Sequence, residues 1–227
     1  MRVHVAFTPA EAAAAPVGVV VDVLRATSTI AQVLASGWPR VLCCAEIEDA
    51  RAVRAELGEG LLAGERDAIR VEGFDVGASP REFLEPSAEP LVLSTTNGTR
   101  TILAAAERCD EVLLGSLLNL GALVETLRQR GEDVAIVCAG YKGAFAIDDA
   151  FCAGRIAAAL GGEPTNAAIG ARLLAGSFAG DEEGLRARTY GPPGLDADIA
   201  FCARESVLDV VPRFAGRVGP AAEIVAA

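Results

Sequence analysis

The stretch VGVVVDVLRATSTIAQVLAS, residues 17–36, carries the clearest information about the fold. Its first part, Val17 to Leu24, is a run of apolar and mostly β-branched residues, which is typical of a strand buried on both faces. Its second part, Ser28 to Ser36, is apolar and Ala-containing with the amphipathic pattern of a helix. The segment therefore predicts a strand followed closely by a helix, with Asp22 and Arg25 near their junction.

The same alternation recurs along the chain. Strand and helix pairs are predicted at 40–44 with 46–56, 91–94 with 99–107, 111–115 with 119–130, and 133–138 with 148–160, and a further strand at 61–65. Strands and helices in regular succession form βαβ units, in which parallel strands are covered by helices on both faces. We therefore expect an α/β fold, a three-layer α/β/α sandwich with a mainly parallel or mixed sheet.

The pattern weakens after Gly161. A helix is predicted at 164–174, residues 179–194 are polar and rich in Gly and Pro, a helix is expected at 195–203, and a last strand at 207–211. No linker rich in Pro or Ser and no internal repeat marks a boundary. The expectation is a single α/β domain over residues 1–227.

The charge balance limits the class of partner. The chain has 20 basic and 31 acidic residues, a net charge of -11, and only 5% aromatic residues. This charge repels nucleic acid and anionic membranes, and few aromatic residues are available to stack on bases. A local group of arginines, helix N-termini and a cation can still bind a small anion, because salt screens distant charges over roughly 10 Å. We therefore expect a small anionic substrate, no nucleic acid and no membrane.

The location of the protein is expected to be cytoplasmic. The N-terminal residues are typical of a short strand and lack the pattern of an export signal, and no uncharged run reaches the roughly 18 residues of a membrane span. The six cysteines lie in apolar surroundings without a C-x-x-C pair, which favours buried free thiols in a reducing compartment.

Polar residues follow several predicted strands, at the edge where parallel α/β sheets bind ligands. These loops are 22–29, 64–66, 73–82, 94–100, 115–119 and 138–149. Single residues in them have an ordinary structural explanation as helix caps or first-turn acids. Capping needs only one hydroxyl, however, and these loops supply several beside acids and arginines. Helix N-termini at such positions suit phosphate or sulfonate oxygens.

Several known types of active site are excluded by spacing. No Cys is followed six residues later by Arg, and no G-x-x-x-x-G-K-[ST] motif is present. The only histidine, His4, lies in the first predicted strand, which makes His-dependent hydrolysis and His-ligated zinc sites poor explanations. The acids Asp196 and Asp198 follow Gly191-Pro192-Pro193-Gly194 and are expected in a surface turn. The remaining oxygen donors favour a hard cation such as Mg2+.

The sequence of these loops resembles that of a known family, the 2-phosphosulfolactate phosphatases. The resemblance covers nearly the whole chain in order. It rests on the segments D-V-L-R-A-T-S-T (22–29), G-F-D (73–75) with S-P (79–80), T-T-N-G-T (95–99), G-S (115–116) with Asn119, C-A-G (138–140) with Asp149 and A-G (153–154), and 198–212. One residue departs from the family pattern: Ala78 stands where an Asn usually precedes the Ser-Pro pair. This removes an amide donor and bears on substrate contacts more than on the type of reaction.

The resemblance implies a Mg2+-dependent phosphatase that converts (R)-2-phospho-3-sulfolactate, or a related 2-phosphohydroxy acid, to the hydroxy acid and phosphate, a step toward coenzyme M. Strand-end placement and the family matches together give a site hypothesis. Asp22 and either Glu65 or Asp75 bind Mg2+, and Asp149 or Asp75 orients the attacking water. Arg25 and Arg66 bind phosphate and sulfonate. The other substrate contacts are expected from Thr27, Ser28, Ser79, Thr95, Thr96, Asn97, Gly98, Thr99 and Lys142.

Two questions stay open at the level of sequence. Attack by water and an aspartyl-phosphate intermediate are both compatible with these residues. The alternatives to a phosphatase are a non-catalytic protein that binds a small anion, and a phosphotransferase or lyase acting on a similar substrate. A homodimer is a reasonable expectation for an apolar chain with exposed strand edges.

Overall fold

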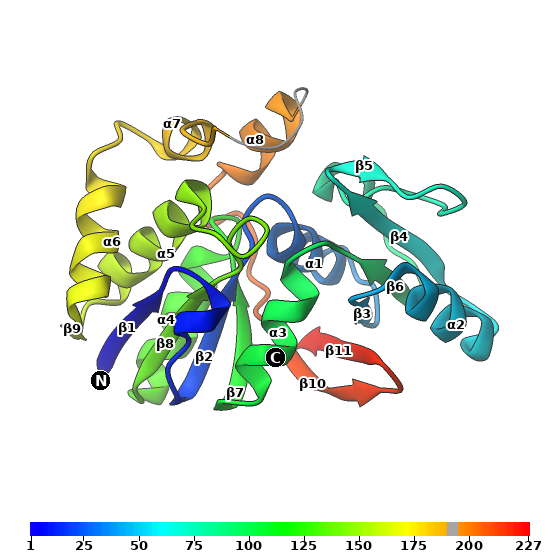
Figure 1. The fold of residues 1–227 in the computed structure, drawn as a ribbon, viewed down its shortest axis with the longest axis horizontal. Helices are drawn as coiled ribbons and strands as arrows, with labels where there is room; N and C mark the ends of the chain where they lie inside the picture. The colour runs from blue at the N-terminus through cyan, green and yellow to red at the C-terminus, as the bar shows by residue number, and fades with distance from the viewer. Residues whose placement is uncertain (190–194) are drawn as a thin grey trace.

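The computed structural model describes residues 1–189 and 195–227. Eleven strands form one sheet in the order β5-β4-β6-β3-β11-β10-β7-β2-β8-β1-β9 (Figure 1). The strands are β1 (Arg2–Ala6), β2 (Ala15–Val21), β3 (Val41–Cys44), β4 (Leu61–Arg66), β5 (Ile69–Arg70), β6 (Leu91–Ser94), β7 (Cys109–Gly115), β8 (Val134–Cys138), β9 (Glu163–Pro164), β10 (Pro212–Val218) and β11 (Ala221–Ala226).

Eight α-helices and two short 3-10 helices are found in the described residues. They are α1 (Ala26–Ala35), α2 (Ile47–Leu57), α3 (Gly98–Ala106), α4 (Leu120–Arg130), α5 (Ile147–Leu160), α6 (Asn166–Gly176), α7 (Asp181–Arg186), α8 (Asp196–Cys202), η1 (Pro9–Glu11) and η2 (Pro80–Glu82). Within residues 1–189 and 195–227, no helix is both long enough and apolar enough to cross a membrane.

The β2 strand shows why the sheet is covered on both faces. Val19 and Val21 pack in one core cluster with α4, α5 and α6, whereas Val20 packs in a second cluster with α1 and α3. Successive side chains of a strand point to opposite faces, so a continuous run of valines requires a helical layer on each side. The α/β/α sandwich predicted from the sequence is confirmed.

The sheet consists of two parallel blocks joined by an antiparallel hairpin. One block contains β7, β2, β8, β1 and β9, and the other contains β4, β6 and β3. The β10 and β11 strands pair with each other and lie between β7 and β3, antiparallel to both. The sheet is therefore mixed and mainly parallel. Three successive antiparallel pairings separate the two blocks, so the strands of one block run opposite to those of the other in the order of the sheet. Figure 1 shows β4 and β6 turned relative to β2, β7 and β8.

The C-terminal part differs from the sequence prediction. The strand expected at 207–211 is wrong: these residues form a connection held by hydrogen bonds from Leu208 N to Leu118 O and from Asn119 Nδ2 to Val210 O. The observed strand, β10, begins at Pro212, directly after the predicted segment ends, and it pairs in the centre of the sheet. The sequence predicted only that residues 179–194 are polar and rich in Gly and Pro; the structure places α7 within this segment. Residues 190–194 lie outside the part of the chain that the structure describes.

Candidate active site

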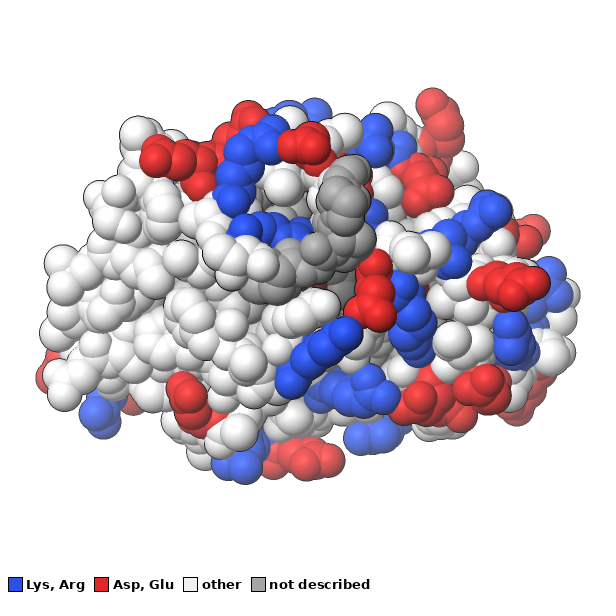
Figure 2. All heavy atoms as spheres, turned by 45° about the horizontal axis from the view of Figure 1, so that its top comes forward, with Lys and Arg blue, Asp and Glu red and all other residues white. Residues whose placement is uncertain are grey.

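A polar pocket lies at the carboxyl ends of β2, β4 and β6. Its polar lining consists of Asp22, Arg25, Glu65, Asp67, Thr95, Thr96, Asn97, Tyr141 and Arg188. Figure 2, in which the top of Figure 1 comes forward, shows Lys and Arg side chains beside Asp and Glu on this face of the molecule. Segments that are far apart in the sequence, from both blocks of the sheet, thus meet at one site.

Asp22 is the buried acid of this pocket. It follows directly on β2 and is 9% exposed, and its Oδ1 accepts a hydrogen bond from the backbone N–H of Ala26 in the first turn of α1. Its Oδ2 lies against Gly98, the first residue of α3: a Cβ atom on Gly98 would be 2.9 Å from that oxygen. The carboxylate therefore lies between the N-terminal turns of two helices.

The surroundings of Asp22 disfavour its charged form. Burial and the nearby negative charge of Glu65, followed by that of Asp148, raise the pKa of Asp22 to about 7, although the Ala26 N–H and Arg25 act in the opposite direction. A carboxylate with this pKa is half-protonated near neutral pH. A cation bound next to it would stabilise the ionised form.

Glu65, near the end of β4, is held by the neighbouring loops. Its Oε1 accepts hydrogen bonds from the backbone N–H and the hydroxyl of Thr96, both at 3.0 Å, and its Oε2 accepts one from Ala68 N at 2.7 Å. A carboxylate has about four acceptor positions, so about one is left for another ligand. Glu65 thus connects the β4–β5 turn to the Thr95–Gly98 turn beside Asp22.

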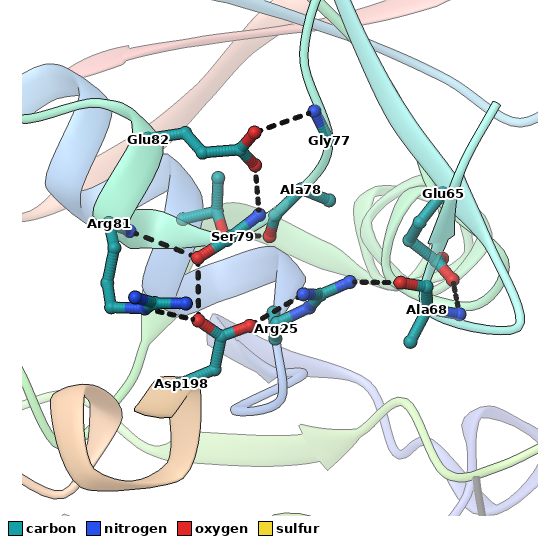
Figure 3. Close-up of polar contacts among 10 residues, drawn as sticks. Arg25, Glu65, Ala68, Gly77, Ala78, Ser79, Arg81, Glu82 and Asp198 are labelled. Atoms are coloured by element: carbon teal, nitrogen blue, oxygen red, sulfur yellow. Dashed lines mark hydrogen bonds and ion pairs between the residues drawn. The ribbon is translucent and has the colours of Figure 1, made fainter. Parts of the chain in front are cut away.

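Arg25 supplies a positive charge to the pocket and is almost immobilised. Its side chain is 8% exposed; Nη1 donates to Asp198 at 2.6 Å and Nη2 donates to the carbonyl of Ala68 at 3.1 Å. Figure 3 shows the guanidinium between these two partners. The Ala68 residue that accepts from Arg25 also donates to Glu65, so one turn fixes both side chains.

Thr27 and Ser28 were predicted to contact substrate, but their hydroxyls bond to the backbone of the preceding loop. Thr27 Oγ1 accepts from Asp22 N and donates to Asp22 O, and Ser28 Oγ donates to Val23 O. Both side chains are fully buried, and neither lines the pocket. They fix the loop that carries Asp22 and Arg25.

The turn from Thr95 to Thr99 begins α3 beside the pocket. Thr95, Thr96 and Asn97 line the pocket, whereas Gly98 packs against Asp22, and Thr99 is buried with its N–H donating to Thr95 Oγ1. Asn97 precedes the helix without capping it through its side chain. This turn therefore brings side-chain oxygens, an amide and a helix N-terminus to the pocket.

Two basic residues proposed as anion ligands are placed elsewhere. Arg66 donates to the carbonyls of Glu65 and Ala45 and to Ser94 Oγ, and it does not line the pocket. Lys142 is exposed and pairs with Asp67 at 2.8 Å, next to the pocket residue Tyr141. The arginine hypothesis is therefore supported by geometry for Arg25 and not for Arg66.

The acids Asp75 and Asp149 also lie outside the pocket lining. Asp75 is exposed beside β4, where its Oδ2 accepts from Leu62 N at 2.8 Å. Asp149 is buried; its two oxygens accept from Val23 N and Gly140 N, and burial, with the charges of Asp148 and Asp22, raises its pKa well above the usual range. Asp149 thus joins two loops of the site, and of the two alternatives for the second cation ligand the geometry favours Glu65 over Asp75.

The sequence reasoning missed four residues of the site, which are Asp198, Arg188, Asp67 and Tyr141. Asp198 was expected in a surface turn, which is wrong: it lies in α8, is 3% exposed, and binds Arg25, Ser79 and Arg81. Arg188 lines the pocket and follows α7. The only signal for Asp198 was its place in the segment 198–212 that matched the family pattern.

The donors fit a hard divalent cation. Asp22 and Glu65 repel each other across the pocket, and the neighbouring donors of the 95–97 turn are oxygens and an amide, the ligand types that Mg2+ prefers. In residues 1–189 and 195–227, no three His, Cys, Asp or Glu side chains are grouped for metal binding. Two carboxylates completed by water and substrate oxygens are a common arrangement for Mg2+.

Fold and pocket define an α/β protein with an acidic pair and a fixed arginine at the carboxyl ends of parallel strands, where such proteins bind ligands. A family model described as 2-phosphosulpholactate phosphatase matches residues 4–217. The chain is 38% identical to a "Probable 2-phosphosulfolactate phosphatase" of Thermus thermophilus, over 97% of this chain and 98% of the relative. Proteins of the same name from Synechococcus and Pseudothermotoga lettingae are 39% and 37% identical, covering 86% and 93% of this chain and 87% and 95% of the relatives. The chain belongs to the 2-phosphosulfolactate phosphatase family.

Proposed function

We propose that this protein uses Mg2+ to hydrolyse the phosphate ester of (R)-2-phospho-3-sulfolactate, or of a related 2-phosphohydroxy acid. The products are the hydroxy acid and phosphate. The observation that carries the proposal is the juxtaposition of buried Asp22, Glu65 and fixed Arg25 in one pocket, in a chain of this family. A substrate with two or three anionic groups needs both a cation and an arginine to offset its charge.

Asp22 and Glu65 would hold the Mg2+, with water and substrate oxygens as its remaining ligands. When bound, Mg2+ would polarise the phosphoryl group and offset its negative charge. A bound cation would also favour the charged form of Asp22, whose pKa is raised to about 7 by burial and by the charges of Glu65 and Asp148.

The substrate contacts would divide between two sides of the pocket. The N-terminus of α3, with Thr96 and Asn97, would bind phosphoryl oxygens, because a helix N-terminus carries N–H groups and a partial positive charge. Arg25 would bind the carboxylate or sulfonate through the face not used by Asp198 and Ala68. The ester oxygen would then lie between the acidic pair and Arg25.

The test is phosphate release from a panel of 2-phosphohydroxy acids, with and without Mg2+. We expect release from 2-phospho-3-sulfolactate that EDTA abolishes and Mg2+ restores, with 3-sulfolactate as the organic product by NMR. A simple phosphomonoester without a neighbouring acid group is expected to react poorly, because it offers Arg25 no second anion.

Other outcomes identify the alternatives. Thermal stabilisation by substrate without phosphate release indicates a binding protein, and phosphate transfer only to an added acceptor indicates a phosphotransferase. Phosphate release with an unsaturated product indicates elimination by a lyase. Any of these three results contradicts the proposed hydrolysis.

We further propose that the protein acts in the cytoplasm. All six cysteines are buried free thiols, which is the usual state in a reducing compartment.

A further inference from the structure

Asp198 connects α8 to the pocket through both of its carboxylate oxygens. Its Oδ2 accepts from Arg25 Nη1 at 2.6 Å, and its Oδ1 accepts from Ser79 Oγ at 2.6 Å and from Arg81 Nε at 2.8 Å. Figure 3 shows the three donors converging on it. Asp198 itself does not line the pocket, so any effect on a ligand has to pass through one of these partners.

Asp198 is suited to remain charged. Burial raises the pKa of Asp198, but the hydrogen bonds from Ser79, Arg81 and Arg25 outweigh it, so the pKa lies below the usual value. At neutral pH the buried carboxylate therefore balances the buried guanidinium of Arg25. The pair also has the second positive charge of Arg81, which is about half-exposed.

Arg25 is the only one of the three partners that lines the pocket within the described residues. With Asp198 on one edge and the Ala68 carbonyl on another, its guanidinium has one orientation with respect to the pocket. Binding to a group that is already oriented costs less conformational entropy than binding to a mobile arginine. The contact with Asp198 thus has a consequence for ligand binding beyond holding α8 in place.

We propose that Asp198 is a positioning residue that orients Arg25 toward the carboxylate or sulfonate of the substrate. The inference rests on the proposed function, because it assigns Arg25 to the second anion of a phosphorylated acid. It differs from a purely structural role, in which Asp198 would act by joining α8 to Ser79 and Arg81 of the η2 region.

The first variant is Asp198→Asn. The amide keeps the shape of the side chain, but its nitrogen is a donor and faces donors, so either Arg25 or the Ser79–Arg81 side loses its acceptor. We expect KM for 2-phospho-3-sulfolactate to rise about 10- to 100-fold, because a misplacement of about 1 Å can cost on the order of a hundredfold. Binding of the product 3-sulfolactate, measured by calorimetry, should weaken by a similar factor.

A double-mutant cycle separates positioning from structure. Arg25→Lys keeps the positive charge but cannot contact Asp198 and Ala68 together. If Asp198 acts through Arg25, Asp198→Asn should raise KM by less than about threefold in the Arg25→Lys background, because coupled residues are not additive. In an Arg81→Met background the full effect of Asp198→Asn should remain. Additive effects with Arg25→Lys overturn the inference.

Two further variants keep the test decisive. Asp198→Glu retains the charge and displaces the carboxylate by one methylene; it replaces Asp198→Asn if that variant does not fold, and the same rise in KM is expected. Glu223→Gln is the matched control, because it removes a carboxylate from the partly buried ion pair with Arg40, and neither residue lines the pocket. This variant should leave KM within twofold of wild type, because sites without shared partners act independently of each other.

The outcomes distinguish the two proposals. A wild-type protein that neither releases phosphate nor binds 3-sulfolactate overturns the proposed function and with it the role of Arg25. A wild-type protein that does both, combined with Asp198 variants that lower Tm but leave KM unchanged, overturns only the positioning role.

Discussion

An Asp22→Asn variant is expected to lose Mg2+-dependent phosphate release by about a thousandfold or more, while remaining folded. The amide has the size of the acid and can still accept from Ala26 N, so local structure is retained. It removes one of the two carboxylates that would hold the cation, whose effect on the barrier is several kcal/mol, and each 1.36 kcal/mol is a factor of ten in rate. Steady-state kinetics over a range of Mg2+ concentrations measure this loss.

The same variant tests the environment of Asp22 through its pH dependence. The pKa of Asp22 is about 7 in the metal-free folded protein and near 3.8 in the unfolded chain. Between pH 3.8 and pH 7, Asp22 is protonated in the folded protein and ionised in the unfolded chain. The stability that comes from protonating Asp22 is therefore complete below pH 3.8 and is lost as pH rises through 7. Metal-free wild-type protein should therefore lose up to about 4 kcal/mol from this group over that range, and Asp22→Asn should not.

Mg2+ should reverse this behaviour, because it competes with the proton on Asp22. Chemical denaturation at pH 5 to 8, with EDTA or with Mg2+, compares the two proteins directly. An Asp22→Asn variant that turns over at a rate near wild type, or that is stabilised by Mg2+ as much as wild type, contradicts the assigned role.

A Gly98→Ala variant is expected to reduce activity about a hundredfold through geometry alone. The added Cβ would lie 2.5 Å from the Cβ of Ala26 and 2.9 Å from Asp22 Oδ2, so α3 or the Asp22 loop has to move. Displacements of about 1 Å in a catalytic group cost on the order of a hundredfold, and overpacking costs about 1 to 3 kcal/mol of stability. The measurements are kcat/KM with saturating Mg2+ and Tm.

Gly170→Ala provides the control for this substitution. Gly170 lies within α6, and a Cβ there has no neighbour within 4 Å. The change should leave activity unaltered and raise stability by about 0.4 to 1 kcal/mol, because alanine has less freedom in the unfolded chain. Equal activities of Gly98→Ala and wild type would show that close packing of α3 on the Asp22 loop is not needed.

The layered fold could be predicted because its signal is local. Each valine-rich run followed by an amphipathic segment specifies a strand and a helix, and βαβ connections then specify parallel pairing. The C-terminal hairpin could not be predicted in the same way. Its central place between β7 and β3 depends on long-range pairing, and the alternation in Pro212–Val218 is broken by Gly216, where the register with β11 shifts.

In the candidate site, too, some residues could be predicted from local sequence and others could not. A place directly after a strand could be predicted for Asp22, Arg25 and the Thr95–Asn97 turn, and these residues do line one pocket. Parallel topology alone does not account for their meeting, because β2 and the pair β4 and β6 lie in blocks that run in opposite directions. Orientation could not be deduced: Arg66 and Asp75 lie in the expected loops, but both are bonded outside the pocket. Asp198 comes from the helix α8, and a search of the loops that follow strands does not identify it.

The central claim is that a divalent cation binds between Asp22 and Glu65 while an acidic substrate group meets Arg25. A crystal structure with Mn2+ in place of Mg2+ and with 3-sulfolactate tests it most directly, because anomalous scattering locates the cation. We predict a single strong peak at about 2.0 to 2.2 Å from oxygens of Asp22 and Glu65, with the sulfonate or carboxylate bonded to Arg25. A cation bound at Asp75, or a ligand outside this pocket, would contradict the account.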